Sequence, residues 1–137
     1  MRYLALASDY DGTLAQHGVV PPETLKALEE FRQSGRRLIL VTGRELPDLK
    51  SMFPWLDLFD RVVAENGAVL YQPDAHNKRV LAAAPDPAFV NALKERGVQP
   101  LAVGDAIVAT WTPTKISSSK RFGISAWNCR SSSIREP

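Results

Sequence analysis

Short apolar segments alternate with amphipathic ones along the first half of the chain. An apolar run at 3–8 is followed by a segment between Pro21 and Gly35 whose apolar residues recur at helical spacing. A second apolar run follows at 38–41. Strand, helix and strand in this order predict a βαβ unit with two parallel strands. Because 3–8 is almost entirely apolar, we expect its strand to be covered on both faces.

The same pattern continues through the middle of the chain. It predicts helices at 45–53 and 85–96, and strands at 61–64, 68–71, 98–103 and 106–111. The Asn66-Gly67 pair lies between two apolar runs, which is a strong signal for a hairpin turn. Periodicity weakens at 72–84, and we expect a loop there.

Composition limits the class of protein. The chain has 137 residues, of which 45% are hydrophobic and 23% charged, as in a soluble globular protein with one domain or one domain and part of another. No apolar stretch reaches membrane-spanning length. The single cysteine, Cys129, cannot form an internal disulfide. We read the N-terminus as a first core strand, not a signal peptide, and expect a cytoplasmic protein without a membrane partner.

The positive charge belongs to the last part of the chain. Residues 114–137 carry five basic residues against one acidic residue, which leaves 1–113 with a net charge of −2. A pI of 8.8 therefore gives no support for nucleic-acid binding by the folded part. A cationic tail that binds nucleic acid or anionic lipid stays open as an alternative for 114–137.

Two carboxylates follow the first predicted strand. Asp9 and Asp11 are two positions apart and precede Gly12 and Thr13. Open α/β sheets bind ligands at the carboxyl ends of their strands. Paired carboxylates there can hold a divalent cation, or one can attack an electrophile while the other transfers a proton. Alternatives are simple strand termination and the metal–nucleotide site that Asp-x-Asp forms in glycosyltransferases.

A second polar cluster, Thr42-Gly43-Arg44, follows the second strand. A hydroxyl, a glycine and the start of a helix are typical of an anion-binding loop. Because parallel strands end at the same edge of a sheet, we expect Thr42 and Asp9 to lie on one rim. Thr42 as an ordinary helix N-cap is the alternative. A third strand end carries Glu65-Asn66-Gly67, for which a simple turn is the alternative.

The three strand ends carry DYDGTL, VTGR and ENG, and in that order they resemble the haloacid dehalogenase (HAD) superfamily of phosphohydrolases. More narrowly, they resemble its Cof-type branch, subfamily IIB. The resemblance covers residues 1 to about 112. It implies an α/β fold: the N-terminal part of a Rossmann-like HAD core with a parallel sheet at 1–80, then the beginning of an α/β cap at 81–113.

The resemblance also implies roles for the acidic pair. Asp9 would be the nucleophile that accepts the phosphoryl group as an aspartyl-phosphate. Asp11 would protonate the leaving alcohol and then deprotonate the attacking water. Both would bind the cofactor Mg²⁺, Asp9 through its carboxylate and Asp11 through its backbone carbonyl.

Five further residues would bind phosphate or substrate in such an enzyme. Thr42 and Gly43 would contact the phosphoryl oxygens, and Arg44 would either face substrate or brace its loop. Glu65 and Asn66 would lie near the hinge to the cap. The partner would be a small phosphorylated metabolite, for example a sugar phosphate or phosphoglycolate. The function implied is a Mg²⁺-dependent phosphomonoester hydrolase; a phosphomutase or a catalytically inactive fragment are the alternatives.

The resemblance ends before two motifs that the family requires, a lysine and a late acidic pair. Residues 114–137 contain seven serines and no usable periodicity. Back-translation from Pro113 in another frame permits an amphipathic helix followed by an apolar strand. We therefore hypothesise that the chain is truncated and that 114–137 is a frameshift product, an aberrant or disordered Ser-rich basic tail.

Overall fold

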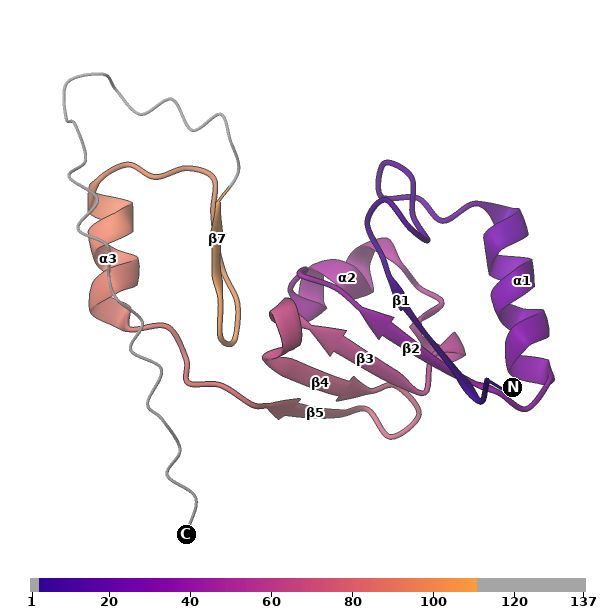
Figure 1. Cartoon of the computed structure of the whole chain (residues 1–137). Coiled ribbons are helices and arrows are strands. Elements are labelled where there is room, and N and C mark those ends of the chain that lie inside the picture. Colours follow the sequence, from indigo (N-terminus) through magenta and orange to yellow (C-terminus); the bar gives the residue numbers. More distant parts are fainter. Residues whose placement is uncertain (1–2, 111–137) are drawn as a thin grey trace, which may run out of the picture.

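The computed structural model describes residues 3–110, and its main feature is a five-stranded sheet (Figure 1). The strands lie in sequence order: β1 (Ala5–Asp9), β2 (Arg37–Val41), β3 (Arg61–Ala64), β4 (Val69–Gln72) and β5 (Asn77–Val80). The first three are parallel, and β4 and β5 are antiparallel additions. Helix α1 (Pro22–Gln33) connects β1 to β2, and α2 (Leu46–Met52) lies between β2 and β3. The α/β class and the βαβ unit are confirmed.

Local sequence explains where α1 begins and ends. Pro22 occupies the first helical position, where its missing N–H costs nothing, and Glu23 in the first turn suits the helix dipole. Beyond the last turn Gly35 has a φ of 79°, a left-handed conformation that glycine adopts without steric cost. The boundaries therefore match those predicted from the prolines and the glycine.

The core lies on the face of the sheet that both helices cover. Leu38 and Leu40 of β2 point into it and are fully buried, while Ile39 between them is half-buried on the opposite face. The same alternation recurs in β3 and β4. The buried cluster combines these strand residues with others from the helices and the loops: Tyr10, Leu14, Val20, Leu28, Leu46, Leu49, Phe53, Phe59, Val62, Val69 and Tyr71.

The expectation that the first strand is covered on both faces is wrong. Strand β1 lies at the edge of the described sheet, with β2 as its neighbour, and Ala5, Leu6 and Ala7 are all exposed. The apolar run was correctly placed as a strand. Its burial was not, because burial depends on neighbours that the run itself does not specify.

The loop predicted at 72–84 contains strand β5, which is a second correction. All four residues of β5, Asn77–Val80, are exposed, and two of them are basic. A polar edge strand has no apolar alternation to reveal it, and its pairing with β4 comes from the short turn between them. The hairpin formed by β3 and β4 at Glu65–Gly67 was predicted and is confirmed.

A second block follows β5. Helix α3 (Pro87–Glu95) precedes a hairpin of β6 (Leu101–Val103) and β7 (Val108–Thr110), which forms its own two-stranded sheet. In Figure 1 the turn of this hairpin lies beside the end of β3. The division into a core at 1–80 and the beginning of a cap at 81–113 stays a prediction, and the tail at 114–137 lies outside the described residues. Within 3–110, no helix is long and apolar enough to cross a bilayer.

Candidate active site

The end of β1 presents two carboxylates on either side of a buried tyrosine. Tyr10 is fully buried, and its hydroxyl donates a hydrogen bond to the Gly18 carbonyl at 3.0 Å. Burial raises the pKa of the Tyr10 hydroxyl, which therefore stays protonated. With Tyr10 anchored in the core, Asp9 and Asp11 are both exposed at the rim.

The end of β2 lies beside them. The register pairs Asp9 with Val41, so Thr42 follows on the same rim, as predicted. Thr42 is only 2% exposed, and its Oγ1 accepts a hydrogen bond from the Arg44 N–H at 3.1 Å. Helix α2 begins at Leu46 with Glu45 as its N-cap residue, so Thr42 is not a helix cap. Its hydroxyl instead shapes the loop that carries Gly43 and Arg44.

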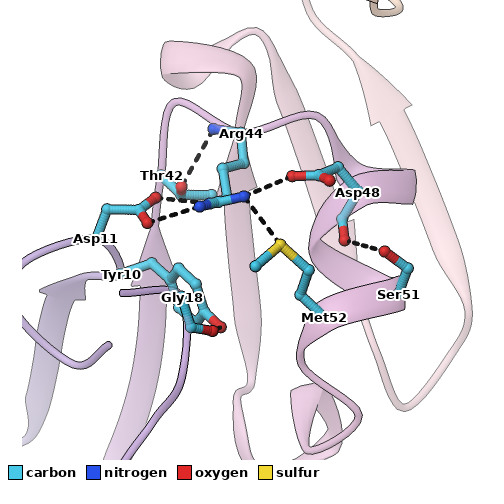
Figure 2. Close-up of polar contacts among 8 residues, drawn as sticks. All are labelled: Tyr10, Asp11, Gly18, Thr42, Arg44, Asp48, Ser51 and Met52. Carbon is cyan, nitrogen blue, oxygen red and sulfur yellow. Dashed lines mark hydrogen bonds and ion pairs between the residues drawn. The ribbon is translucent and has the colours of Figure 1, made fainter. Parts of the chain in front are cut away.

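Arg44 connects the two strand ends (Figure 2). Its guanidinium donates to both carboxylate oxygens of Asp11, at 2.7 and 2.8 Å, and to Asp48 of α2 at 2.7 Å. It also contacts the Met52 sulfur at 3.0 Å and lies 5.7 Å from the centre of the Tyr10 ring. Of the two roles considered for Arg44, bracing its loop is the one these contacts display.

This arrangement fixes the charge of Asp11. Hydrogen bonds from Arg44 hold the pKa of the Asp11 carboxyl below its usual range, against a smaller opposing effect of burial. The same contacts raise the pKa of the Arg44 guanidinium. A bidentate arginine–carboxylate pair is directional as well as attractive, so Asp11 is held as an oriented carboxylate at neutral pH.

The third strand end places its two candidate residues differently. The Glu65 side chain is fully buried, and its carboxylate accepts hydrogen bonds from the β6–β7 turn, the nearest at 2.7 Å from the Ala106 N–H. Asn66 is exposed, in a left-handed conformation with φ 55°, and its side chain abuts Gly43. A Cβ at Gly43 would lie 2.8 Å from the Asn66 Oδ1, so the glycine permits this close approach. The structure thus places Asn66 beside the Thr42–Arg44 loop and directs the Glu65 side chain away from it.

A cavity of about 460 Å³ lies over the rim. Its floor comes from the strand ends and α2, and its opposite wall from the β6–β7 hairpin. The lining residues are Asp9, Asp11, Gly43, Arg44, Glu45 and Asp48 on the floor, and Ala102, Ile107, Ala109 and Thr110 on the wall. Four of the seven predicted site residues therefore meet at one cavity, and Thr42 is buried next to two of them in the same loop.

Sequence reasoning missed two acidic residues of the floor. Asp48 lies four residues after Arg44, a spacing at which helical side chains pair, and this signal was available. Glu45 gave none. Burial raises the pKa of Glu45, and the nearby carboxylates of Glu65, Asp48 and Asp105 raise it further. The Glu45 Oε1 is buried and has no hydrogen-bond partner within residues 3–110.

The acidic pair offers oxygen ligands suited to Mg²⁺. The Asp9 carboxylate is exposed, lines the cavity and makes no hydrogen bond or ion pair to the rest of the described chain. Mg²⁺ commonly binds one or two carboxylates and completes its shell with water and substrate phosphate. The Asp9 carboxylate is a ligand of this kind, and the Asp11 backbone carbonyl as a second ligand stays a prediction; residues 3–110 contain no cluster of three or more metal-ligating side chains.

Comparison with known proteins gives a consistent family. The profile of haloacid dehalogenase-like hydrolases matches residues 6–122. Pyridoxal phosphate phosphatase YbhA of Escherichia coli is 37% identical over 83 residues, which cover 60% of this chain and 30% of that enzyme. A phosphoglycolate phosphatase of Metallosphaera sedula is 36% identical over 69 residues, covering 48% and 31%. The matched region thus spans about a third of each curated relative.

Solved structures show the same relationship. A haloacid dehalogenase-like hydrolase from B. subtilis superposes with a TM-score of 0.55 at 25% identity, covering 72% of this chain and 34% of the other. The subclass IIB sugar phosphatase BT4131 superposes with a TM-score of 0.54 at 25% identity, covering 76% and 42%. These matches agree with the branch that the three strand-end motifs indicated.

Proposed function

Because the chain belongs to the haloacid dehalogenase-like hydrolase family, we propose that it is built for Mg²⁺-dependent hydrolysis of small phosphomonoesters through an aspartyl-phosphate on Asp9. One observation carries the proposal. The Asp9 carboxylate, which has no hydrogen-bond or ion-pair partner within residues 3–110, lines one cavity with the oriented Asp11 carboxylate and the Gly43–Arg44 loop. This shared position supports the proposed roles, in which Asp9 is the nucleophile, Asp11 carries the proton and the Gly43–Arg44 loop binds the phosphoryl group.

The proposed chemistry has two steps. A carboxylate oxygen of Asp9 attacks phosphorus, forming an acyl phosphate while the bond from phosphorus to the ester oxygen breaks; Asp11 gives a proton to the departing alkoxide. In the second step Asp11 takes a proton from water, which attacks the acyl phosphate and releases inorganic phosphate and free Asp9. Bound Mg²⁺ would offset the repulsion between carboxylate and phosphate.

Arg44 must release Asp11 for the first step. In the described arrangement the guanidinium holds Asp11 ionised, whereas a general acid carries a proton. A phosphate group that enters the cavity is an alternative anionic partner for Arg44, because the planar guanidinium binds phosphate oxygens in bidentate geometry. We infer that substrate draws Arg44 from Asp11, which raises the pKa of that carboxyl as chemistry begins.

The cavity wall supports a small organic phosphate as substrate. Ala102, Ile107 and Ala109 face the acidic floor, so the phosphoryl group would lie at the floor and the rest of the molecule against an apolar surface. The named activities of the relatives, on pyridoxal phosphate and phosphoglycolate, belong to this substrate class. A sugar phosphate is equally compatible with the volume.

Hydrolysis of p-nitrophenyl phosphate tests the proposal. We expect Mg²⁺-dependent turnover by the full chain, abolished by EDTA, and a loss of roughly a thousandfold or more in kcat for Asp9→Asn. Asp57→Asn makes the same chemical change at an exposed position outside the cavity and should leave turnover unchanged. Folded wild-type chain without activity would refute the proposal for this chain. Turnover that requires a bisphosphate activator would indicate a phosphomutase instead.

A further inference from the structure

The Glu65 carboxylate binds three successive backbone N–H groups of a segment forty residues away. Oε1 accepts from the Asp105 N–H at 3.0 Å, and Oε2 from the Ala106 and Ile107 N–H groups at 2.7 and 3.2 Å. Consecutive backbone amides that converge on one point form an anion-binding concavity. Here the anion is a side chain of the chain itself, at the end of β3.

Because Glu65 is buried, its carboxylate needs hydrogen-bond donors from the protein. Glu65 is fully buried, and a buried carboxylate is destabilising unless hydrogen bonds replace its lost hydration. The three amides of the β6–β7 turn supply them. Within the described chain they have no other hydrogen-bond acceptor, whereas the neighbouring Gly104 N–H donates to the Ile107 carbonyl at 2.9 Å and closes the turn. Carboxylate and turn therefore satisfy each other.

Two further features fit the turn to the carboxylate. A Cβ at Gly104 would lie 2.7 Å from the Glu65 Cδ and Oε2, so this position accommodates the carboxylate only as glycine. Lys78 of β5 forms an ion pair with the Asp105 carboxylate at 2.8 Å, which is a second contact between the turn and the sheet. Glu65 itself has a φ of 51°, a costly conformation for a residue with a side chain, which persists where surrounding contacts enforce it.

The hairpin held in this way is also the wall of the proposed active site. Ile107 donates its N–H to Glu65 and lines the cavity opposite Asp9 and Asp11, and Ala102 and Ala109 extend the same surface. Glu65 does not line that cavity. Its effect on the cavity passes through the backbone of the turn, and loss of the contact would free the wall while leaving the acidic floor intact.

We propose that Glu65 is a positioning residue that holds the β6–β7 hairpin over the phosphoryl-transfer site and thereby sets which organic groups fit beside the phosphate. The specificity part rests on the proposed phosphatase function. The holding part does not, because it concerns a contact that exists without substrate. Two measurements on the full chain separate them.

Amide hydrogen exchange, read by NMR, tests the holding role. In Glu65→Gln one accepting oxygen becomes an NH₂ group that faces amide donors, so exchange at Asp105, Ala106 and Ile107 should accelerate roughly ten- to a hundredfold. The Gly104 amide reports the turn itself and should change little. Glu30→Gln, the same substitution at an exposed carboxylate, is the matched control. Unchanged exchange in a folded Glu65→Gln protein would overturn the proposal.

A second variant covers the case in which Glu65→Gln does not fold. Gly104→Ala keeps the glutamate at position 65, but its added Cβ prevents the β6–β7 turn from approaching the Glu65 carboxylate. Hydrogen exchange at the same three amides should therefore accelerate. Wild-type exchange rates in Gly104→Ala would overturn the proposal independently.

Relative activity on small and bulky esters tests the specificity role. We expect the ratio of kcat/KM for phosphoglycolate to that for pyridoxal phosphate to move towards one in Glu65→Gln, mainly through KM. A uniform fall in kcat with the ratio preserved would show a merely structural contribution and overturn this role. Inactive wild-type chain would refute the phosphatase function, while the exchange result would still decide the holding role.

Discussion

The pair formed by Arg44 and Asp11 makes a quantitative prediction about charge at the rim. Its two hydrogen bonds measure 2.7 and 2.8 Å, and the side chains are 27% and 48% exposed. Exposed ion pairs contribute about 0.2–1 kcal/mol, and bidentate geometry with a half-buried arginine places this pair near the upper end, at about 1 kcal/mol. A double-mutant cycle of Arg44→Ala and Asp11→Ala, measured by urea unfolding at pH 7, should return that coupling energy.

The pH dependence follows from the lowered pKa of Asp11. A carboxyl whose pKa is depressed by folding contributes stability that is fully present above its unfolded pKa, about 3.9, and is lost as pH falls through the folded value. The coupling should therefore be equal at pH 7 and pH 5. An NMR titration of the Asp11 carboxyl carbon should give a lower midpoint in wild type than in Arg44→Ala.

The Lys26–Glu30 pair is the matched control. Its atoms are 3.9 Å apart and its side chains 77% and 65% exposed, so its coupling should be no more than about 0.5 kcal/mol. A coupling energy for Arg44 and Asp11 no larger than that of this control would refute the described geometry of the pair. A titration midpoint of Asp11 that is unaffected by Arg44→Ala would refute it as well.

Three further predictions concern the framework of the site. Leu38→Ala should lower the free energy of unfolding by about 2–5 kcal/mol, since Leu38 is fully buried, while Leu81→Ala at a 57% exposed position should cost less than about 1 kcal/mol; equal losses in urea unfolding would contradict the assigned core. Asp60 accepts a hydrogen bond from the Leu38 N–H at 2.9 Å and another from Arg37. Burial opposes ionisation of Asp60, but these hydrogen bonds outweigh burial and lower its pKa. Asp60→Asn should therefore lower the free energy of unfolding at pH 7, and the loss should shrink as the pH falls through the folded pKa. Urea unfolding at pH 7 and pH 3 measures whether the loss is smaller at the lower pH. Gly18 and Gly35 have φ values of 80° and 79°; among the described residues, a Cβ at Gly18 would lie 2.7 Å from Met52 Cε, whereas a Cβ at Gly35 would meet no atom. Because Met52 Cε is the far end of a flexible side chain that is 40% exposed, Met52 can move aside, and Gly18→Ala should cost the same as Gly35→Ala within about 0.5 kcal/mol by thermal unfolding. A much larger cost at Gly18 would show that Met52 is fixed in place.

Local sequence signals were sufficient for the parallel strands and for the rim. Asp9 and Thr42 follow apolar runs joined by a helix, and parallel pairing places such strand ends together. The turn at Asn66-Gly67 could also be predicted from the sequence, because few residues other than asparagine and glycine adopt a positive φ at low cost. In each case the deciding interaction lies within a few residues or follows from strand direction.

The errors concern properties set by distant neighbours. The apolar run of β1 is at the edge of the sheet that residues 3–110 form, and the polar strand β5 shows no alternation. The hydrogen bond between Glu65 and Ala106 joins residues forty-one positions apart, and no spacing in the sequence predicts it. For the same reason the sequence placed both Arg44 and Asp11 in the site but did not predict the ion pair between them.

Acid quenching can trap the phosphoryl group that we propose is transferred to Asp9. The full chain is mixed with Mg²⁺ and p-nitrophenyl phosphate, quenched in acid after a short delay, digested and examined by mass spectrometry. We expect one phosphorylated peptide that contains Asp9. It should be more abundant in Asp11→Asn, where the water is no longer activated, and absent in Asp9→Asn. A phosphorylated peptide that persists in Asp9→Asn, or turnover without any phosphorylated protein, would contradict the proposed transfer to Asp9.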